Sequence, residues 1–270
     1  VLFRSEEWKE KMKAYAEAHP DLAKQFDMMQ NCELPEDWET IIPEFPADAK
    51  GLATRESSSK ILNTIADKIP WFMGGSADLG PSTKTYIKEA SSFNKENYGG
   101  RNFHFGVREH AMGAIINGMS LSKLRPYGAT FFVFSDYVRP AIRLSSLMKQ
   151  PVVYIFTHDS IGVGEDGPTH QPVEHLASLR AMPGLDVIRP SDANELSVMW
   201  KYIMRLKDRP VALVLSRQGM PTLDRSKYAP ADGALKGAYV LIESDGIPDV
   251  ILIGTGSEMQ ICLDAYEQLA

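Results

Sequence analysis

The chain has 270 residues, 44% hydrophobic and 24% charged, which is enough to bury one core and begin a second. Its 29 basic and 35 acidic residues give a net charge of -6, which excludes a broad cationic surface for nucleic acid or an anionic membrane. No apolar run reaches the roughly 20 residues that a membrane span needs, and the N-terminus lacks a secretory apolar region. The two distant cysteines, Cys32 and Cys262, fit neither a disulfide framework nor a zinc site, so we expect a reducing compartment, by default the cytoplasm.

Residues 1–50 are predicted to form a helical arm and a linker. The first five residues carry no helix-capping signal and are set aside as foreign sequence. Apolar residues then recur at helical spacing in two stripes that His19-Pro20 separates: Trp8, Met12 and Tyr15, then Leu22, Phe26 and Met29. Residues 34–50 lack periodicity and contain Pro43 and Pro46, which indicates an extended linker ahead of a folded unit that starts near Thr54.

Residues 51–230 alternate between strand and helix patterns, as in an α/β domain. We predict helices at 54–68, 109–122, 136–148, 172–181 and 192–206. We predict strands at 71–73, 102–105, 127–130, 152–157, 186–188 and 211–216. The runs 152–156 and 211–215 are apolar on both faces, which indicates a parallel sheet with helices on each side.

Residues 231–270 are predicted to be a linker and the start of a second α/β domain. Val250 to Ile253 has the pattern of a buried strand, and the Gly254-Thr255-Gly256 turn leads from it into a helix. The helix has run about four turns when the chain stops at Ala270, so we expect this domain to be unfinished.

Ligands of such sheets gather beyond the carboxyl ends of the strands, where the loops after Met73, Phe105, Thr130, Thr157 and Ser216 should converge. The first of these loops contains Gly74-Gly75, which permit close approach of a ligand, followed by Asp78 and Ser82. A tight turn with a solvated Asp explains the same pattern, so this signal is weak alone.

Glu109 begins a predicted helix that is apolar nearly all round and therefore buried. A carboxyl group in that place must be protonated, paired or hydrogen-bonded to a ligand. A half-exposed Glu that is favourable to the helix dipole is the alternative. Phe131, Phe134 and Tyr137 follow at a spacing of three, which would place them on one helical face as a platform for a flat ring, although such stripes are usually core.

The predicted loop from Thr157 to Pro172 is unusually rich in side chains that can bind or react with a ligand. It presents three glycines and the polar residues His158, Glu165, Asp166 and His170, and Pro172 is expected to start a helix. Their spacing does not match a compact zinc or iron motif, and contacts with a polyol or phosphate suit this set equally well.

Arg55 and Arg217 lie on segments predicted to face the ligand. Guanidinium groups bind phosphate oxygens in a bidentate manner and would supply positive charge that the acidic chain otherwise lacks. Each taken alone is better explained as a surface ion pair.

Taken together, these runs closely resemble the transketolase family from about Leu34 to Ala270. The resemblance rests on Gly-Gly-Ser-Ala-Asp-Leu at 74–79, Gly-Val-Arg-Glu at 106–109, the whole run 157–172 and Leu-Ser-Arg-Gln at 215–218. It implies a thiamine-diphosphate-binding fold and the transfer of a two-carbon ketol unit from a ketose phosphate to an aldose phosphate, a reaction of the pentose phosphate pathway.

The resemblance also implies roles for the candidate residues. Glu109 would hydrogen-bond the aminopyrimidine of thiamine diphosphate and promote its imino tautomer, which then takes the proton from the thiazolium carbon. Catalytic roles also fall to His158 and His170. The remaining cofactor contacts would be Asp78, Phe131, Phe134 and Tyr137, with Phe134 as the stacking partner. The sugar-phosphate contacts would be Arg55, Ser82, His170 and Arg217, and the contacts with substrate hydroxyls would be His158 and Asp166.

In this family the diphosphate and its Mg²⁺ or Ca²⁺ ion are held by an N-terminal domain, and the site forms between two subunits of a homodimer. No cation-binding motif is found in this sequence, so we expect no metal ligand here and no ketol transfer by the chain alone. Its exposed inter-domain faces should favour self-association.

Three other readings remain open. Another thiamine enzyme is one: residues 164–172 favour transketolase over deoxyxylulose-phosphate synthase but do not exclude dihydroxyacetone synthase. A naturally split transketolase is the second, and the arm and linker before Thr54 argue against it. The third is a non-catalytic sugar-phosphate-binding module, against which Glu109 and the two histidines count.

Overall fold

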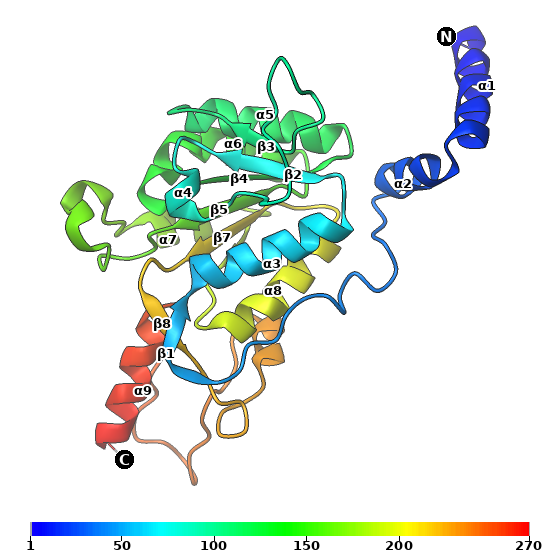
Figure 1. The fold of residues 1–270 in the computed structure, drawn as a ribbon. Helices are drawn as coiled ribbons and strands as arrows, with labels where there is room; N and C mark the ends of the chain where they lie inside the picture. The colour runs from blue at the N-terminus through cyan, green and yellow to red at the C-terminus, as the bar shows by residue number, and fades with distance from the viewer. Residues whose placement is uncertain (1, 270) are drawn as a thin grey trace.

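The computed structural model describes residues 2–269 and is built around a six-stranded sheet in which every pair of strands is parallel. The order across the sheet is β3-β2-β4-β5-β7-β6 (Figure 1). The strands are β2 (Phe72–Ser76), β3 (Asn102–His104), β4 (Arg125–Phe131), β5 (Val153–Thr157), β6 (Asp186–Ile188) and β7 (Val211–Leu215). The predicted parallel α/β sheet is confirmed.

Helices cover both faces of the sheet. They are α3 (Thr54–Lys68), α5 (Glu109–Leu121), α6 (Ser135–Leu147), α7 (His175–Arg180) and α8 (Ala193–Arg205), with the short α4 (Gly80–Thr83) beside β2. Alternate residues of β5 divide between two cores: Val153 and Ile155 pack with α3 and α8, whereas Tyr154 and Phe156 pack with α5, α6 and α7. A strand buried on both faces must be apolar throughout, which is why its sequence is a continuous apolar run.

The Gly74-Gly75 pair serves the sheet and not, as predicted, a loop. Both glycines lie within β2, with φ outside the left-handed region. A Cβ on Gly74 would lie 2.1 Å from the Tyr127 carbonyl oxygen, and one on Gly75 would lie 1.8 Å from that of Phe103. Close packing against the neighbouring strands therefore requires glycine here, and the left-handed turn comes later, at Asp78 with φ 60°.

The predicted helical arm is present as α1 (Leu2–Ala18) and α2 (Pro20–Gln30), which stand away from the sheet (Figure 1). The segment after it is more than a linker, because Trp38 and Ile42 are buried in the α3/α8 core. β1 (Asp48–Ala53) then pairs antiparallel with β8 (Gly219–Thr222). The expected boundary at residue 50 thus falls inside a strand.

Two expected elements differ in the structure. Val250 to Ile253 forms no strand and its four side chains are exposed; no strand within residues 2–269 pairs with it, and an isolated strand has no ladder of hydrogen bonds to hold it. The helix after it is present as α9 (Glu258–Leu269). Pro172 does not start a helix: α7 begins at His175, after the 3₁₀ turns η2 (Gly164–Asp166) and η3 (Pro168–His170).

The remaining short elements are the 3₁₀ turns η1 (Phe132–Phe134) and η4 (Ala231–Lys236). Within residues 2–269, every helix is too short or too polar to cross a bilayer.

Candidate active site

The carboxyl ends of the central strands lie level with one another. In the strand register Phe131 of β4 is opposite Thr157 of β5, which is opposite Leu215 of β7. On the other side, Ser76 at the end of β2 is opposite Ala129 of β4. The loops that follow these strands therefore leave the sheet at one edge, as predicted.

Arg55 lies in the first turn of α3 and joins three of these segments. The Arg55 Nη1 nitrogen donates a hydrogen bond of 2.9 Å to the Ser82 carbonyl oxygen and lies 3.5 Å from His158 Nε2. Its Nε is buried and has no hydrogen-bond partner among the described residues. Burial lowers the pKa of Arg55, and the nearby positive charge of Arg217 acts in the same direction. An anion beside these guanidinium groups would satisfy the free donor and relieve the repulsion.

His158 sits at the end of β5 with its side chain 3% exposed. Its φ of 59° is left-handed, which is unusual for a residue with a side chain. Nδ1 lies 2.9 Å from Thr157 Oγ1, and the ring packs against Phe131 with centroids 3.7 Å apart. Burial, aided by the charge of Arg55, lowers the pKa of His158 to about 4, so the imidazole is neutral near pH 7.

Asp166 connects this histidine to Arg217. The Asp166 Oδ2 atom lies 3.8 Å from His158 Nε2 and 3.8 Å from Arg217 Nε. These separations exceed hydrogen-bond length. Five of the six predicted substrate contacts lie in this one polar group: Ser82, Arg55, His158, Asp166 and Arg217.

The three aromatic residues form a ladder of rings, but on a different backbone from the one predicted. Phe131 ends β4, Phe134 ends η1 and Tyr137 lies in α6, so they do not share a helical face. Neighbouring rings in the ladder are 6.2 and 5.9 Å apart and nearly parallel. Phe131 is buried beneath His158, whereas Phe134 is part-buried and Tyr137 is exposed. His170 meets Phe134 edge to face at 5.4 Å, which brings the second histidine to this ladder.

Glu109 is the first residue of α5 and is 8% exposed. Its carboxylate makes no hydrogen bond to another residue in the part of the chain that the structure describes. Gly113 of α5 packs closely against Val138 and Ala141 of α6, and Asn117, one turn later in α5, contacts Ala141 and Ser145. Because the contacts advance along both helices together, α5 and α6 run in the same direction. The start of α5, with Glu109, therefore lies at the same edge as the start of α6, beside the aromatic ladder.

Asp78 and Ser82 occupy the turn that follows β2. Asp78 is exposed, and Ser82 meets Arg55 through its backbone carbonyl and not its hydroxyl. Both lie at the ligand-side edge of the sheet, as the pattern indicated.

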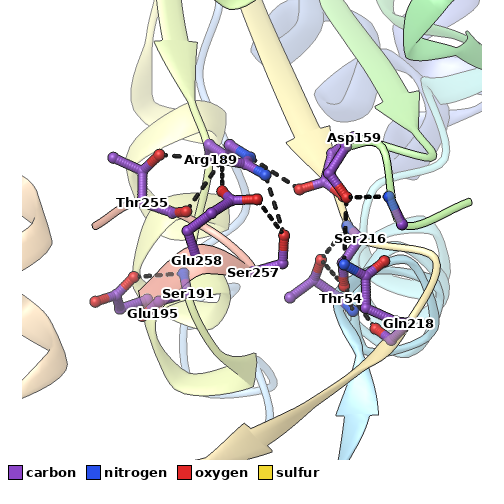
Figure 2. Close-up of polar contacts among 12 residues, drawn as sticks. Thr54, Asp159, Arg189, Ser191, Glu195, Ser216, Gln218, Thr255, Ser257 and Glu258 are labelled. Carbon is purple, nitrogen blue, oxygen red and sulfur yellow. Dashed lines mark hydrogen bonds and ion pairs between the residues drawn. The ribbon is translucent and has the colours of Figure 1, made fainter. Parts of the chain in front are cut away.

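Sequence reasoning missed two polar clusters near these residues. Asp159, next to His158, is paired with Arg189, as Figure 2 shows. Asp136 and Glu174 flank the buried His175, whose Nε2 lies 3.2 Å from Asp136 Oδ2. No spacing rule could have revealed either cluster, because each joins elements that are about thirty or more residues apart in the sequence.

Comparison with known protein families identifies the family of this chain. The family described as "Transketolase, pyrimidine binding domain" matches residues 50–222, and the one described as "Transketolase-like TK C-terminal domain" matches residues 237–270. The chain belongs to the transketolase family. Transketolases of Halalkalibacterium halodurans and Bacillus subtilis are 53% and 52% identical to it over 98% and 99% of its length. The chain spans 40% of the length of each of these relatives.

Similar solved structures support the same family assignment. A transketolase of Pichia stipitis, in complex with sedoheptulose 7-phosphate, is 40% identical, with a TM-score of 0.93 over 99% of this chain and 40% of that one. A split-gene transketolase, described as an inactive β4 tetramer, is 30% identical, with a TM-score of 0.52 over 64% of this chain and 54% of that one. The expected thiamine-diphosphate-binding fold is confirmed.

Proposed function

We propose that this chain supplies the pyrimidine-binding half of a transketolase active site, in an enzyme that moves a two-carbon ketol unit from a ketose phosphate to an aldose phosphate. The single observation that carries the proposal is the place of the Glu109 carboxylate, which has no hydrogen-bond partner among residues 5–269 and stands beside a ladder of aromatic rings. The carboxylate is therefore an acceptor that no other described residue occupies, and a ligand that donates a hydrogen bond can use it.

These residues fit the aminopyrimidine of thiamine diphosphate. Glu109 would accept a hydrogen bond from the ring, and Phe134 would stack on it because its face is only part-buried. Tyr137, Asp78 and Phe131 would complete the pocket, Phe131 chiefly by supporting His158. When bound, the cofactor supplies the nucleophilic carbon for ketol transfer.

The polar group at the strand ends fits a sugar phosphate. Arg55 and Arg217, with Ser82 and His170, would hold the phosphate, because two guanidinium groups near each other attract a dianion. A neutral His158 can exchange a proton with a substrate hydroxyl, and Asp166 can accept a hydrogen bond from the next one. The complex of the Pichia stipitis enzyme with sedoheptulose 7-phosphate supports this class of substrate.

The other half of the site would come from a transketolase N-terminal domain that holds the diphosphate and a Mg²⁺ or Ca²⁺ ion, within a cytoplasmic homodimer. We therefore expect the 270-residue chain to be inactive alone. The inactive β4 tetramer of a split-gene transketolase supports this expectation.

A ketol-transfer assay tests the proposal. The chain is mixed with thiamine diphosphate, Mg²⁺, xylulose 5-phosphate and ribose 5-phosphate, with or without a separately made N-terminal transketolase domain of known competence. We expect activity only when both proteins are present. Glu109→Ala and Glu109→Gln should lower that activity at least about 100-fold, because alanine removes the acceptor for the cofactor ring and glutamine replaces the carboxylate with a neutral amide that cannot exchange a proton.

Glu89→Gln provides the matched control, since Glu89 is exposed and is not one of the site residues. This variant should transfer ketol units at the normal rate. No activity on mixing, with both proteins shown to be folded, would contradict the proposal, as would full activity of Glu109→Gln.

A further inference from the structure

Arg189 follows β6 and joins the loop of His158 to the C-terminal segment (Figure 2). Its side chain is 5% exposed, and its Nε donates a hydrogen bond of 2.8 Å to Asp159 Oδ2, an atom of a side chain that is 1% exposed. The other two guanidinium nitrogens turn the opposite way, toward residues 255–258. One guanidinium group thus binds two segments that are about a hundred residues apart in the sequence.

The contacts on the C-terminal side are numerous. Arg189 Nη1 donates to the Thr255 carbonyl at 3.0 Å and to Thr255 Oγ1 at 3.2 Å, and it pairs with the Glu258 carboxylate at the start of α9. Nη2 donates to Ser257 Oγ at 3.1 Å. Such a set needs the planar, multidentate donor of arginine, because a lysine has a single nitrogen.

The Asp159 end of this cluster bears on His158, the residue before it. The left-handed backbone of His158, with φ 59°, is strained and persists only where surrounding contacts fix it. Asp159 is fixed through the Arg189 bond, while its other oxygen, Oδ1, is buried without a partner among the described residues. Release of that bond would leave a buried carboxylate unpaired and free the backbone at the start of the loop.

We propose that Arg189 is a positioning residue for His158, which couples the orientation of that imidazole to the docking of Thr255–Glu258. The inference rests on the proposed function, in which His158 contacts a substrate hydroxyl. It assigns the C-terminal segment a part in shaping the substrate side of the site, through the path Glu258, Arg189, Asp159 and His158.

Nuclear magnetic resonance of ¹⁵N-labelled histidine rings in the 270-residue chain tests the coupling, with the His158 signal assigned from a His158→Gln variant. Glu258→Gln removes the charged partner of Arg189 at the far end of the cluster. We expect it to move the His158 signal and to raise the pKa of His158 by about one unit toward the ordinary value, because a freed ring is better hydrated. Loss of a negative charge alone would lower that pKa, so the sign separates repositioning from simple electrostatics.

Arg189→Lys keeps the charge but loses the multidentate contacts, and it should move the His158 signal in the same direction. Two matched controls, Glu267→Gln on α9 and Arg180→Gln on α7, alter exposed residues and should leave the signal unchanged. Amide hydrogen exchange of residues 258–269 reports separately whether α9 has been released.

A His158 signal and pKa that stay at their wild-type values in Glu258→Gln would overturn the inference, whether or not α9 exchanges faster, and so would a lowered pKa. The measurement needs no catalysis. Failure of the ketol-transfer assay would therefore remove the proposed role of His158 without deciding the coupling, and failure of the coupling would leave the ketol-transfer proposal intact.

Discussion

At the scale of single residues, the role proposed for His158 requires a neutral imidazole. The imidazole is enclosed by Phe131, Arg55 and Thr157, and burial is the main cause of its low pKa. The imidazole is therefore held in place before any substrate arrives, because Nδ1 lies beside Thr157 Oγ1 and Nε2 lies beside Arg55 Nη1.

The low pKa makes stability depend on pH. The folded-state pKa of about 4 lies below the ordinary 6.5, so the unfolded chain binds more protons between these values, and stability falls as pH drops through that window. This one group should cost at most about 3 kcal/mol of unfolding free energy by pH 4, with none of the loss above pH 6.5.

Urea unfolding of wild type and His158→Gln at pH 7.5 and pH 4.5 isolates this contribution. The variant should lose less stability than the wild type over that interval, because glutamine does not titrate. His19→Gln, on the exposed arm, should behave as the wild type does. Equal losses in wild type and His158→Gln would contradict the prediction.

At the scale of elements, residues of the segment from Arg189 to Glu195 form hydrogen bonds with several parts of the chain that lie after β8. Asp192 caps α8 by accepting the Glu195 N–H at 2.8 Å, and its second oxygen accepts from the Leu223 N–H at 3.0 Å and from Arg225 at 2.9 Å. The Glu195 carboxylate then accepts from the Tyr239 hydroxyl. One helix start therefore fixes the long connection that follows β8.

Asp192→Asn should lower the free energy of unfolding by about 3 kcal/mol, because Asp192 is fully buried and Arg225 would lose its charged partner. The measurement is the urea midpoint at pH 7.5, where the slope with denaturant should stay unchanged. Asp232→Asn, an exposed change on η4, should leave the midpoint within about 0.5 kcal/mol of wild type. A similar midpoint for both variants would show that the charge of Asp192 is not needed.

The elements also show which parts of the fold can be predicted from sequence. Helix 54–68 and strand 186–188 were predicted with their observed bounds, because apolar spacing and nearby breakers are local signals. His158 and Arg217 were singled out for the same reason, since they follow apolar runs, and the roles of all the candidate site residues stay predictions. The β1–β8 pair was missed, because its partners lie at residues 48–53 and 219–222 and neither strand is strongly patterned.

Other misses have physical causes of the same kind. Gly74 and Gly75 carry a turn signal, but the need for closely packed strands overrides it. Val250 to Ile253 has a strand pattern without a neighbouring strand to pair with in residues 2–269. The bond between Asp159 and Arg189 depends on how two loops meet, which no periodicity encodes.

At the scale of the whole molecule, one helical layer presents apolar side chains to solvent. On α5 and α6 the exposed apolar residues are Ile115, Leu121, Leu144 and Leu147. A patch of this kind on neighbouring helices is typical of an interface. We predict that the chain self-associates through this layer.

Sedimentation velocity over a concentration series measures the effect. The double change Leu144→Glu with Leu147→Glu should shift the chain toward the monomer by at least about tenfold in dissociation constant, because two charges would be buried in the contact. Leu22→Glu, on the arm and equally exposed, is the matched control and should not alter the series. Unchanged association of the double variant would place the interface elsewhere.

The exposed helix α1 makes one tryptophan of the chain distinguishable from the others by its fluorescence. Of the four tryptophans, Trp8 on α1 is 55% exposed, whereas Trp38, Trp71 and Trp200 are at most 7% exposed. Indole emission is sensitive to hydration, so the spectrum should combine one red-shifted, quencher-accessible component with a larger blue-shifted one. In a Trp8→Phe variant the tryptophan emission would come only from the three buried indoles. A red shift of that emission would then report unfolding of the sheet domain without any contribution from α1.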